Sequence, residues 1–461
     1  MTLIKSISGI RGTIGGSPGE NLTPLDVVQF SAAFAQWMME KHPKEKLKVV
    51  LGRDARVSGP VISQVVAATL QSMGVDVIDL DLATTPTTEM AVVKLRAHGG
   101  IILTASHNPA QWNALKLLND KGEFISSSDG NRLLDIIEMG KYSFVAYNQI
   151  GKLSTYPLAN DDHIRQVLDL PLVDVAAIKA AGFRVAIDCV NSVGGLVLPN
   201  LLKKLGVQEV IELYCEPTGI FPHNPEPLPE HLTEIAAVIK NREADLGFVV
   251  DPDVDRLAIV NEDGTMFGEE YTLVAVADYI LQNKKGNTVS NLSSTRALRD
   301  VSQKHGVKYS AAAVGEVNVV EMMKETQAVI GGEGNGGIIY PELHYGRDAL
   351  VGIALFLTHL AKSGKKCSEL RKSYPAYFMS KNKIELSSGS DVDALLEKVK
   401  QNFSEETINL VDGVKIDFSN GWVHLRKSNT EPIIRIYSEG ASEAEAGSLA
   451  QKVMEVIKAV V

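Results

Sequence analysis

Three aspartates at alternate positions give the strongest chemical signal in the sequence. Asp251, Asp253 and Asp255 follow the apolar run Leu246–Val250, and a second apolar run begins at Leu257. Two negative charges about 4 Å apart repel each other by about 4 kcal/mol at an effective dielectric constant of about 20. Three carboxylates therefore converge only around a cation, and oxygen ligands without histidine or cysteine favour Mg²⁺. A solvated acidic turn is the alternative interpretation.

A second polar loop, Thr104–Pro109, follows a short apolar strand pattern. A serine at the tip of such a loop, here Ser106, is a candidate nucleophile, with Lys116 as a candidate proton acceptor. His107 adds a group that can bind an anion. An ordinary turn is the alternative, because serine, asparagine and proline are frequent turn residues.

Two further loops contain groups that suit sugars and phosphates. The loop Gly331–Gly337 matches the letters of a dinucleotide-binding motif, but no helix pattern follows it, which argues against that function. Glu333 and Asn335 are instead candidates for binding sugar hydroxyl groups. Downstream, a candidate phosphate cradle contains Arg426, Ser428, Asn429 and Thr430, with Arg435 close by. A polar hairpin loop is the alternative for this segment.

Isolated arginines also occur near the N-terminus, at Arg11, Arg53 and Arg56. Arginines of this kind usually form surface ion pairs. Only their combination with the loops described above makes them candidates for a functional site.

Strand and helix patterns alternate through the first three quarters of the chain, which predicts α/β layers with polar loops at the strand ends. The last part predicts a helix at Asp391–Asn402, short strands, and a closing helix at Ser442–Val460. The predicted fold is α/β: three consecutive α/β domains with mixed sheets, followed by a C-terminal α+β domain. The predicted boundaries are 1–152, 153–256, 257–375 and 376–461.

Composition excludes several classes of protein. Of 461 residues, 46 are Lys or Arg and 56 are Asp or Glu, so the formal charge is 46 − 56 = −10. This balance argues against nucleic acid as the main partner. Cys189, Cys215 and Cys367 lack the spacing of a thiolate zinc site or a disulfide framework. The absence of a signal-peptide pattern and of apolar runs of about 18–20 residues predicts no membrane partner and a cytoplasmic location.

The combination of these loops, in this order along the whole chain, resembles the α-D-phosphohexomutases. That resemblance implies four domains around one central cleft. It implies that Ser106 is the phosphorylated nucleophile and binds Mg²⁺ together with Asp251, Asp253 and Asp255. His107 and Lys116 would assist proton transfer, and Arg11 would contact the phosphoserine.

The resemblance also assigns the substrate-binding groups. Glu333 and Asn335 would face the sugar, and Arg256 would contact the substrate. The phosphate that is not reacting would be held by Arg426, Ser428, Asn429, Thr430 and Arg435.

The implied reaction moves a phosphoryl group between the 6- and 1-positions of a hexose phosphate, with a hexose 1,6-bisphosphate as intermediate and activator. The segment that carries Ser106 favours glucosamine 6-phosphate as the substrate of a monomeric or homodimeric enzyme. Two departures point to a phosphomannomutase or phosphoglucomutase instead: Gly337 stands where the family usually has histidine, and the phosphate loop reads SNTEP. A metal-dependent phosphatase, which needs no second phosphate cradle, and a non-enzymatic sugar-phosphate-binding protein are the alternatives from other classes.

Overall fold

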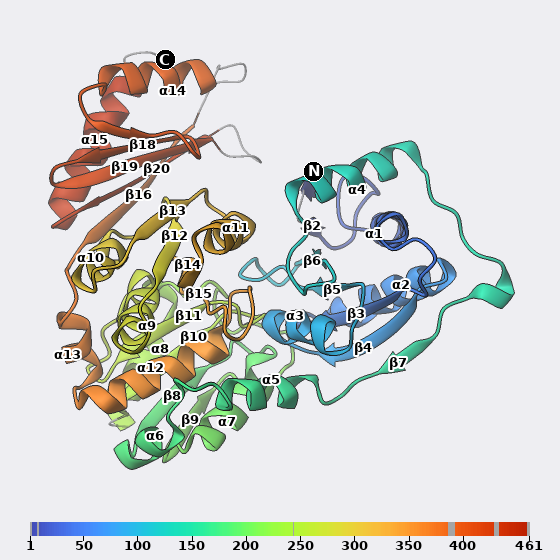
Figure 1. Ribbon diagram of the computed structural model, residues 1–461, viewed down its shortest axis with the longest axis horizontal. Helices are drawn as coiled ribbons and strands as arrows, with labels where there is room; N and C mark the ends of the chain where they lie inside the picture. Colours follow the sequence, from blue (N-terminus) through green and yellow to red (C-terminus); the bar gives the residue numbers. More distant parts are fainter. Residues whose placement is uncertain (1, 7–8, 243, 386–391, 428–432, 459–461) are drawn as a thin grey trace. The chain divides into compact units, whose positions relative to one another are not determined.

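The computed structural model describes residues 2–6, 9–242, 244–385, 392–427 and 433–458 (Figure 1). They form two compact units. The first unit comprises Met1–Thr272 and Asn335–Leu370, and the second comprises Leu273–Gly334 and Arg371–Val461. Each unit contains two of the four sheets, apart from a short strand, β15 (Gly337–Ile339), which belongs to the first unit.

The first unit begins with a seven-stranded mixed sheet. Strand β3 pairs in parallel with β4 and β5, whereas β6, β2 and β1 extend the sheet in antiparallel fashion. In spatial order, the strands are β1 (Ile4–Ser6), β2 (Gly9–Thr13), β6 (Trp112–Leu118), β5 (Gly99–Leu103), β3 (Lys48–Arg53), β4 (Asp76–Leu82) and β7 (Leu153–Thr155). The pairing of β2 with β6 places residues 9–13 beside residues 112–116, which lie about 100 positions further along the chain.

Helices cover this sheet and bury two separate apolar cores against it. The helices of this part are α1 (Pro24–Lys41), α2 (Gly59–Ser72), α3 (Thr85–Lys94) and α4 (Ser127–Met139), with a short 3-10 helix, η1 (Tyr147–Gln149). Local sequence determines where they start. In α1, the Asp26 carboxylate accepts the Thr23 backbone N–H at 3.0 Å, and Pro24 occupies the first turn.

A second sheet of the first unit has the order β11-β10-β8-β9. Its strands are β8 (Arg184–Asp188), β9 (Glu209–Leu213), β10 (Leu246–Val250) and β11 (Leu257–Asn261). Both β10 and β11 are buried along their whole length, as expected for continuous apolar strands. The accompanying helices are α5 (Ala159–Leu168), α6 (Val175–Ala181), α7 (Gly194–Leu205), η2 (Pro229–His231), α8 (Thr233–Arg242) and the start of α9 (Glu269–Asn283).

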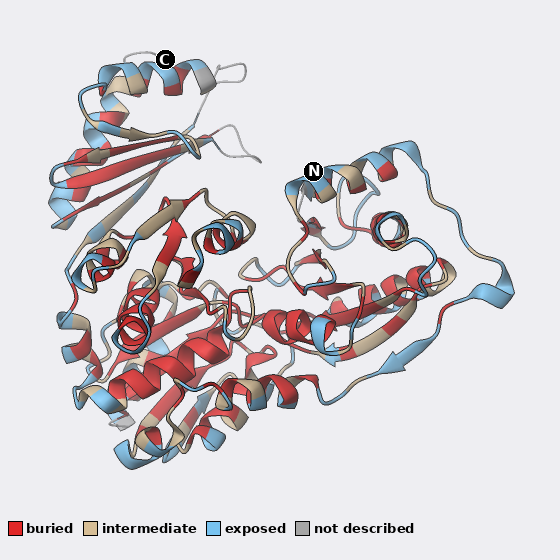
Figure 2. Ribbon diagram, viewed as in Figure 1, coloured by how far each residue is buried: buried red, intermediate tan, exposed pale blue. Residues whose placement is uncertain are grey.

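Helix α12 (Ala349–Ser363) is buried from Ala349 to Leu360, as its red colour in Figure 2 shows. It packs against α5, α6 and α7. The loop that precedes α12 is therefore fixed in place beside the second sheet.

The second unit contains a parallel group of strands and an antiparallel sheet. Strand β12 (Asn287–Asn291) pairs in parallel with β13 (Tyr309–Ala312) and β14 (Ala328–Glu333), beside α10 (Ala297–Lys304) and α11 (Glu316–Thr326). Helix α13 (Cys367–Lys372) leads from the first unit into the second. The antiparallel sheet consists of β16 (Phe378–Glu385), β20 (Ile433–Gly440), β19 (Gly421–Lys427), β18 (Val414–Phe418) and β17 (Thr407–Asn409), with α14 (Val392–Asn402) and α15 (Glu443–Lys458).

The predicted fold class is confirmed: α/β parts with mixed sheets precede a C-terminal part with an antiparallel sheet. The single central cleft and the predicted domain boundaries stay predictions. One strand was missed, because the short strands predicted for the last part of the chain follow the helix at Asp391–Asn402, whereas β16 precedes it. Its side chains are exposed or half-buried along its length, so no apolar alternation marks it.

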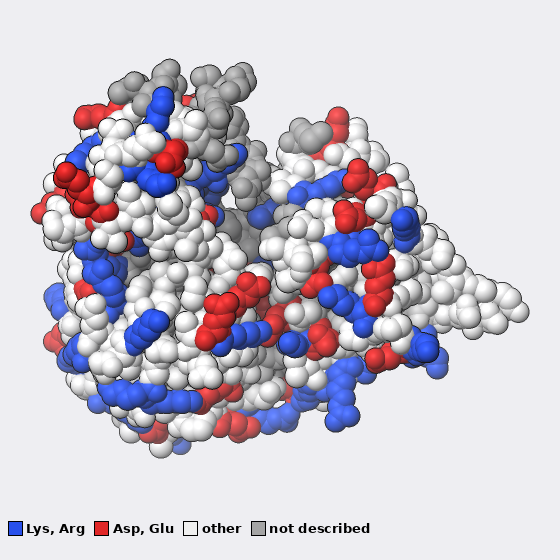
Figure 3. Space-filling model, turned by 45° about the horizontal axis from the view of Figure 1, so that its top comes forward, with Lys and Arg blue, Asp and Glu red and all other residues white. Residues whose placement is uncertain are grey.

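No helix in the described part of the chain is long and apolar enough to cross a membrane. On the face drawn in Figure 3, lysine and arginine side chains are interspersed with aspartate and glutamate, without an extended field of positive charge.

Candidate active site

The three aspartates lie in the turn between β10 and β11, at the carboxyl end of β10. All three are fully buried, and their candidate ligand atoms lie within 4.8 Å of one another. Val254, between the second and third aspartates, has a φ of +64°. This left-handed residue turns the chain, so alternate side chains converge on one point.

Asp251 links the acidic turn, Asp251–Asp255, to the serine loop, Thr104–Pro109. Its Oδ2 accepts a hydrogen bond from Ser106 Oγ at 2.6 Å, while Oδ1 accepts the backbone N–H groups of Asp255 and Arg256, both at 3.2 Å. Burial, followed by the charges of Asp255 and Asp253, raises the pKa of Asp251 well above its ordinary value. The candidate nucleophile and the acidic cluster thus form one site.

The other two aspartates each have one oxygen bound and one oxygen left over. Asp253 Oδ2 accepts Thr85 Oγ1 at 2.6 Å and Lys116 Nζ at 2.7 Å, and Asp255 Oδ2 accepts an Arg347 N–H at 2.6 Å. Their Oδ1 atoms are buried and have no hydrogen-bond partner among the described residues. Buried carboxylate oxygens are costly to leave unpaired, so this donor set fits a hard divalent cation.

Lys116, on β6, stays positively charged in this environment. Burial acts to lower its pKa, but the carboxylates of Asp253 and Asp255 outweigh burial and raise it. For Asp253 the balance is reversed: burial acts to raise its pKa, and the charge and hydrogen bond of Lys116 lower it below the ordinary value. A charged Lys116 suits the stabilisation of a phosphate better than the acceptance of a proton.

Ser106 follows β5 and has a φ of +48°, which is uncommon for a residue other than glycine. Its backbone N–H donates to Thr104 Oγ1 at 2.9 Å, and that hydroxyl donates to Asp54 Oδ2 at 2.6 Å. His107 Nδ1 lies 3.4 Å from Ser106 Oγ. Burial, then the Arg256 cation, lowers the pKa of His107 to about 3. His107 is therefore neutral at physiological pH.

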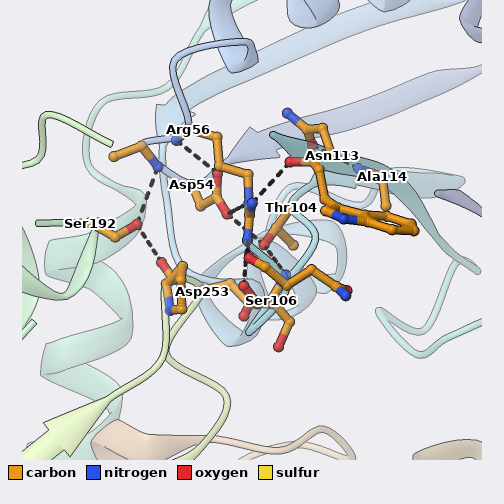
Figure 4. Close-up of polar contacts among 12 residues, drawn as sticks. Asp54, Arg56, Thr104, Ser106, Asn113, Ala114, Ser192 and Asp253 are labelled. Carbon is orange, nitrogen blue, oxygen red and sulfur yellow. Dashed lines mark hydrogen bonds and ion pairs between the residues drawn. The ribbon is translucent and has the colours of Figure 1, made fainter. Parts of the chain in front are cut away.

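Arg56, which we expected at the surface, is fully buried beneath the serine loop (Figure 4). Its Nε donates to Asp54 Oδ2 at 3.0 Å. Its two terminal nitrogens donate, at 2.5–2.9 Å, to the carbonyl oxygens of Ser106, Asn108, Pro109 and Trp112. Five donors in a planar fork suit this task, which lysine cannot perform. The only sequence signal was the Asp-x-Arg spacing of Asp54 and Arg56.

The Asp54–Arg56 loop also connects to the acidic turn. The Ala55 N–H donates to Ser192 Oγ at 3.3 Å, and that hydroxyl donates to the carbonyl oxygen of Pro252 at 2.7 Å (Figure 4). Pro252 lies between the first two aspartates of the turn. Two short polar loops therefore position the serine and the acidic turn relative to each other.

Further cations lie on and beside the site. Arg11 and Lys116 share a face of the β2–β6 pair, since Gly9 is paired with Lys116 and Arg11 lies two residues further along β2. Desolvation by surrounding protein and then the charge of Arg256 lower the pKa of Arg11, although much of its side chain is still exposed. Clustered cations of this kind suit the binding of a phosphate dianion.

The two sugar-binding candidates have different surroundings. Glu333 ends β14 in the second unit, where Oε1 accepts Asn291 Nδ2 at 2.9 Å and the Gly315 N–H at 3.1 Å. Asn335 belongs to the first unit, and its Oδ1 accepts the Gly337 N–H at 3.2 Å. Asn291 and Gly315 were not singled out in the sequence, and they hold Glu333 in a fixed orientation.

In the second unit, Arg426 and Arg435 are directly paired on β19 and β20. Arg426 Nε forms an ion pair with Asp412 Oδ2 at 2.7 Å, and Arg435 is exposed. The remaining members of the predicted phosphate cradle, Ser428, Asn429 and Thr430, lie outside the described residues.

Comparison with known proteins gives four family matches in chain order. They are the phosphoglucomutase/phosphomannomutase domain I (residues 3–143), domain II (161–264), domain III (268–377) and C-terminal domain (383–456).

Individual relatives extend over nearly the whole chain. A phosphoglucomutase/phosphomannomutase of Thermococcus kodakarensis is 35% identical, over 94% of this chain and 95% of its own length. A phosphoglucosamine/phosphogalactosamine mutase of Sulfurisphaera tokodaii is 30% identical, over 98% of each chain. A crystal structure of a phosphoglucomutase/phosphomannomutase family protein from Burkholderia thailandensis matches with a TM-score of 0.85 and 25% identity, and the match covers 99% of this chain and 97% of that one.

Proposed function

Since this chain belongs to the phosphoglucomutase/phosphomannomutase family and is a phosphohexomutase, we propose that it acts through a phosphoserine at Ser106, a Mg²⁺ ion and a hexose 1,6-bisphosphate. One observation carries the proposal: Ser106 Oγ lies 2.6 Å from Asp251, beside two buried carboxylate oxygens that lack hydrogen-bond partners among the described residues. A phosphoryl group on Ser106 would meet both the cation site and the surrounding arginines. Phosphoryl transfer depends mainly on such positioning and charge neutralisation.

The reaction takes place in two transfers of opposite direction. In the first, the bond between phosphorus and Ser106 Oγ breaks and a bond to a sugar hydroxyl oxygen forms. The hydroxyl proton passes by way of a neutral base such as His107 to the released Ser106 Oγ, which becomes a hydroxyl group again. The 1,6-bisphosphate then turns around, and its other phosphoryl group returns to Ser106. Asp251, Asp253 and Asp255 would hold the Mg²⁺ ion, which would supply neutralisation of the charge on the transferring group. Arg11, Lys116 and Arg256 add positive charge on the protein side.

Binding of the substrate requires a second phosphate site, because the bisphosphate carries a phosphate at each end. We assign this site to Arg426, Ser428, Asn429, Thr430 and Arg435. Glu333 and Asn335 are assigned to the sugar hydroxyl groups. The cationic pair on β19 and β20 and the fixed orientation of Glu333 support these assignments.

For the substrate, we propose glucosamine 6-phosphate, with glucosamine 1-phosphate as the product. The loop that carries Ser106 and the relative named as a phosphoglucosamine/phosphogalactosamine mutase support this choice. Mannose 6-phosphate or glucose 6-phosphate is the second candidate, favoured by the 35% identical relative named as a phosphoglucomutase/phosphomannomutase.

Phosphorus NMR with Mg²⁺ and a trace of the matching 1,6-bisphosphate tests the proposal, with the three sugar 6-phosphates offered separately. We expect kcat/KM for glucosamine 6-phosphate to exceed the others about 100-fold, a difference of about 2.7 kcal/mol in the transition state. Comparable rates on mannose or glucose phosphates would favour the second candidate. Release of free phosphate from all three would contradict a mutase.

The phosphoserine is tested separately. The Ser106→Ala variant should lose turnover and the mass increment of one phosphoryl group, about 80 Da, in intact-protein mass spectrometry. The exposed Ser128→Ala variant is the matched control and should keep both. Wild-type turnover by Ser106→Ala would exclude Ser106 as the nucleophile.

A further inference from the structure

Gly337, the first residue of β15, stands out because its backbone does not require glycine. Its φ lies outside the left-handed region in which side chains are disfavoured. A Cβ atom at this position would instead lie 2.4 Å from Arg347 Cδ, 3.0 Å from Arg347 Cγ and 3.1 Å from Asn335 Oδ1. Real side chains essentially never approach this closely, so Arg347 occupies the space that a side chain at position 337 would need.

Arg347 is held in this position by the backbone on both sides. Ile339 and Arg347 form an antiparallel bridge, and the Asp348 N–H donates to the Ile338 carbonyl at 2.8 Å. The Ala349 N–H donates to the carbonyl of Val254, within the acidic turn, at 3.2 Å. The stem of Arg347 starts from this fixed point and reaches the acidic turn by passing beside Gly337.

The guanidinium of Arg347 meets one oxygen of Asp255. Arg347 is 9% exposed, and its N–H donates to Asp255 Oδ2 at 2.6 Å, which leaves Asp255 Oδ1 buried and without a hydrogen-bond partner among the described residues. A carboxylate that is bound through one oxygen keeps a single orientation, and its second oxygen stays directed at the acidic cluster.

We propose that Arg347 is a positioning residue for Asp255, and that Gly337 is the partner position that admits it. The pair works as one unit: Arg347 fixes the carboxylate for a divalent cation, and any side chain at position 337 displaces the guanidinium. The inference rests on the proposed function only in treating Asp255 as a cation ligand.

The test is a double-mutant cycle of Gly337→Ala, Arg347→Ala and the double variant, followed by thermal unfolding over a MgCl₂ titration. A cation that binds only the folded protein raises Tm with a measurable midpoint concentration, and this readout needs no turnover. Each single variant should move the midpoint to at least about threefold higher Mg²⁺, and the double variant should match Arg347→Ala within about twofold. Gly447→Ala, whose Cβ meets nothing within 4 Å, is the matched control.

Two outcomes would overturn the inference. Shifts that multiply in the double variant would show that the two positions act independently. A midpoint at lower Mg²⁺ in Arg347→Ala would show that the guanidinium is only a competing positive charge. If Arg347→Ala fails to fold, Arg347→Lys keeps the charge and most of the stem; it should raise the midpoint by a smaller factor, and an unchanged midpoint would exclude positioning.

Mutase turnover, measured on the same proteins, separates this inference from the proposed function. An inactive wild-type protein that still shows the coupled Mg²⁺ midpoints would contradict the mutase proposal and leave the Gly337–Arg347 pair in place. An active wild-type protein whose variants shift the Mg²⁺ midpoint independently would support the mutase proposal and contradict the Gly337–Arg347 pair.

Discussion

Arg56 shows how a single buried side chain can position the candidate nucleophile Ser106 through its backbone, without contacting its hydroxyl group. Its terminal nitrogens bind the carbonyl oxygens of Ser106, Asn108 and Pro109 in the serine loop and that of Trp112 at the start of β6. Asp54 balances its charge within the same buried space. The loop's backbone carbonyls would otherwise be short of donors, because the chain there is neither helix nor strand. Arg56 is thus a positioning residue for Ser106.

We predict that Arg56→Lys lowers kcat about 100-fold with a small change in KM, because three donors of lysine cannot reproduce the planar fork and a misplaced nucleophile slows the chemical step. Steady-state kinetics check this prediction. Arg132→Lys, at an exposed ion pair with Glu40, is the control and should behave as wild type. A variant with altered KM alone would place Arg56 at substrate binding instead.

At the scale of elements, a buried ionic network fixes the loop before α12. His163 Nε2 and His344 Nε2 lie 2.9 Å and 3.3 Å from Asp348 Oδ2, and Asp348 Oδ1 accepts the Leu350 N–H at 2.8 Å as the cap of α12. His344 Nδ1 also lies 3.3 Å from Glu89 Oε2. Because Arg347 directly precedes Asp348, the loop before α12 contacts both this network and the acidic turn.

The network gives a pH-dependent stability. Burial acts to lower the pKa of His344, but Asp348 and Glu89 outweigh it and raise the pKa to about 10. Because the folded-state pKa is raised, the contribution of charged His344 to the free energy of unfolding is complete below the unfolded-state pKa of about 6.5. That contribution is lost as pH rises through about 10. His344→Gln should therefore cost about 3 kcal/mol at pH 7 and clearly less at pH 10.

Urea unfolding of wild type and His344→Gln at the two pH values checks this prediction, with His231→Gln in η2 as control. A difference between wild type and variant that is the same at both pH values would show that His344 is not charged in the folded protein.

A glycine at the start of α7 shows that close packing can reverse a helix propensity. A Cβ at Gly195 would lie 1.9 Å from the Cys215 carbonyl oxygen, whereas one at Gly447 in α15 would meet nothing within 4 Å. Gly447→Ala should stabilise by up to about 1 kcal/mol through helix propensity. Gly195→Ala should destabilise by about 2 kcal/mol because the backbone must move. Thermal unfolding of both variants checks this prediction. A change in stability of the same sign in both variants would contradict the packing argument.

For the whole molecule, the C-terminal part has a complete core of its own. Its apolar cluster consists of residues between Ile384 and Ile457, from α14, α15 and the antiparallel sheet. We predict that the fragment 376–461 folds alone, with a stability of a few kcal/mol typical of so small a core, about 3 kcal/mol. Circular dichroism and urea unfolding of the fragment check this. A chain without a cooperative transition would show that this part folds only with the rest.

The sequence alone indicated which groups the candidate site contains. The acidic turn and the loop serine were visible because they directly follow apolar strands, and Lys116 because it lies ten residues after Ser106. Hydrophobic periodicity determined the α/β fold class. It could not reveal β16, whose exposed edge carries no apolar alternation, or the burial of Arg56, because its carbonyl partners lie about 50 residues further along the chain.

Only the tertiary structure decided which oxygens of the aspartates are bound and which are left for a cation. Those contacts join Asp253 to Lys116 across 137 positions and Asp255 to Arg347 across 92. The same holds for Gly337, where the sequence shows a missing side chain and the structure shows the arginine that fills its place. Local patterns report periodicity and residue type, whereas the use of each polar atom depends on which distant segment packs against it.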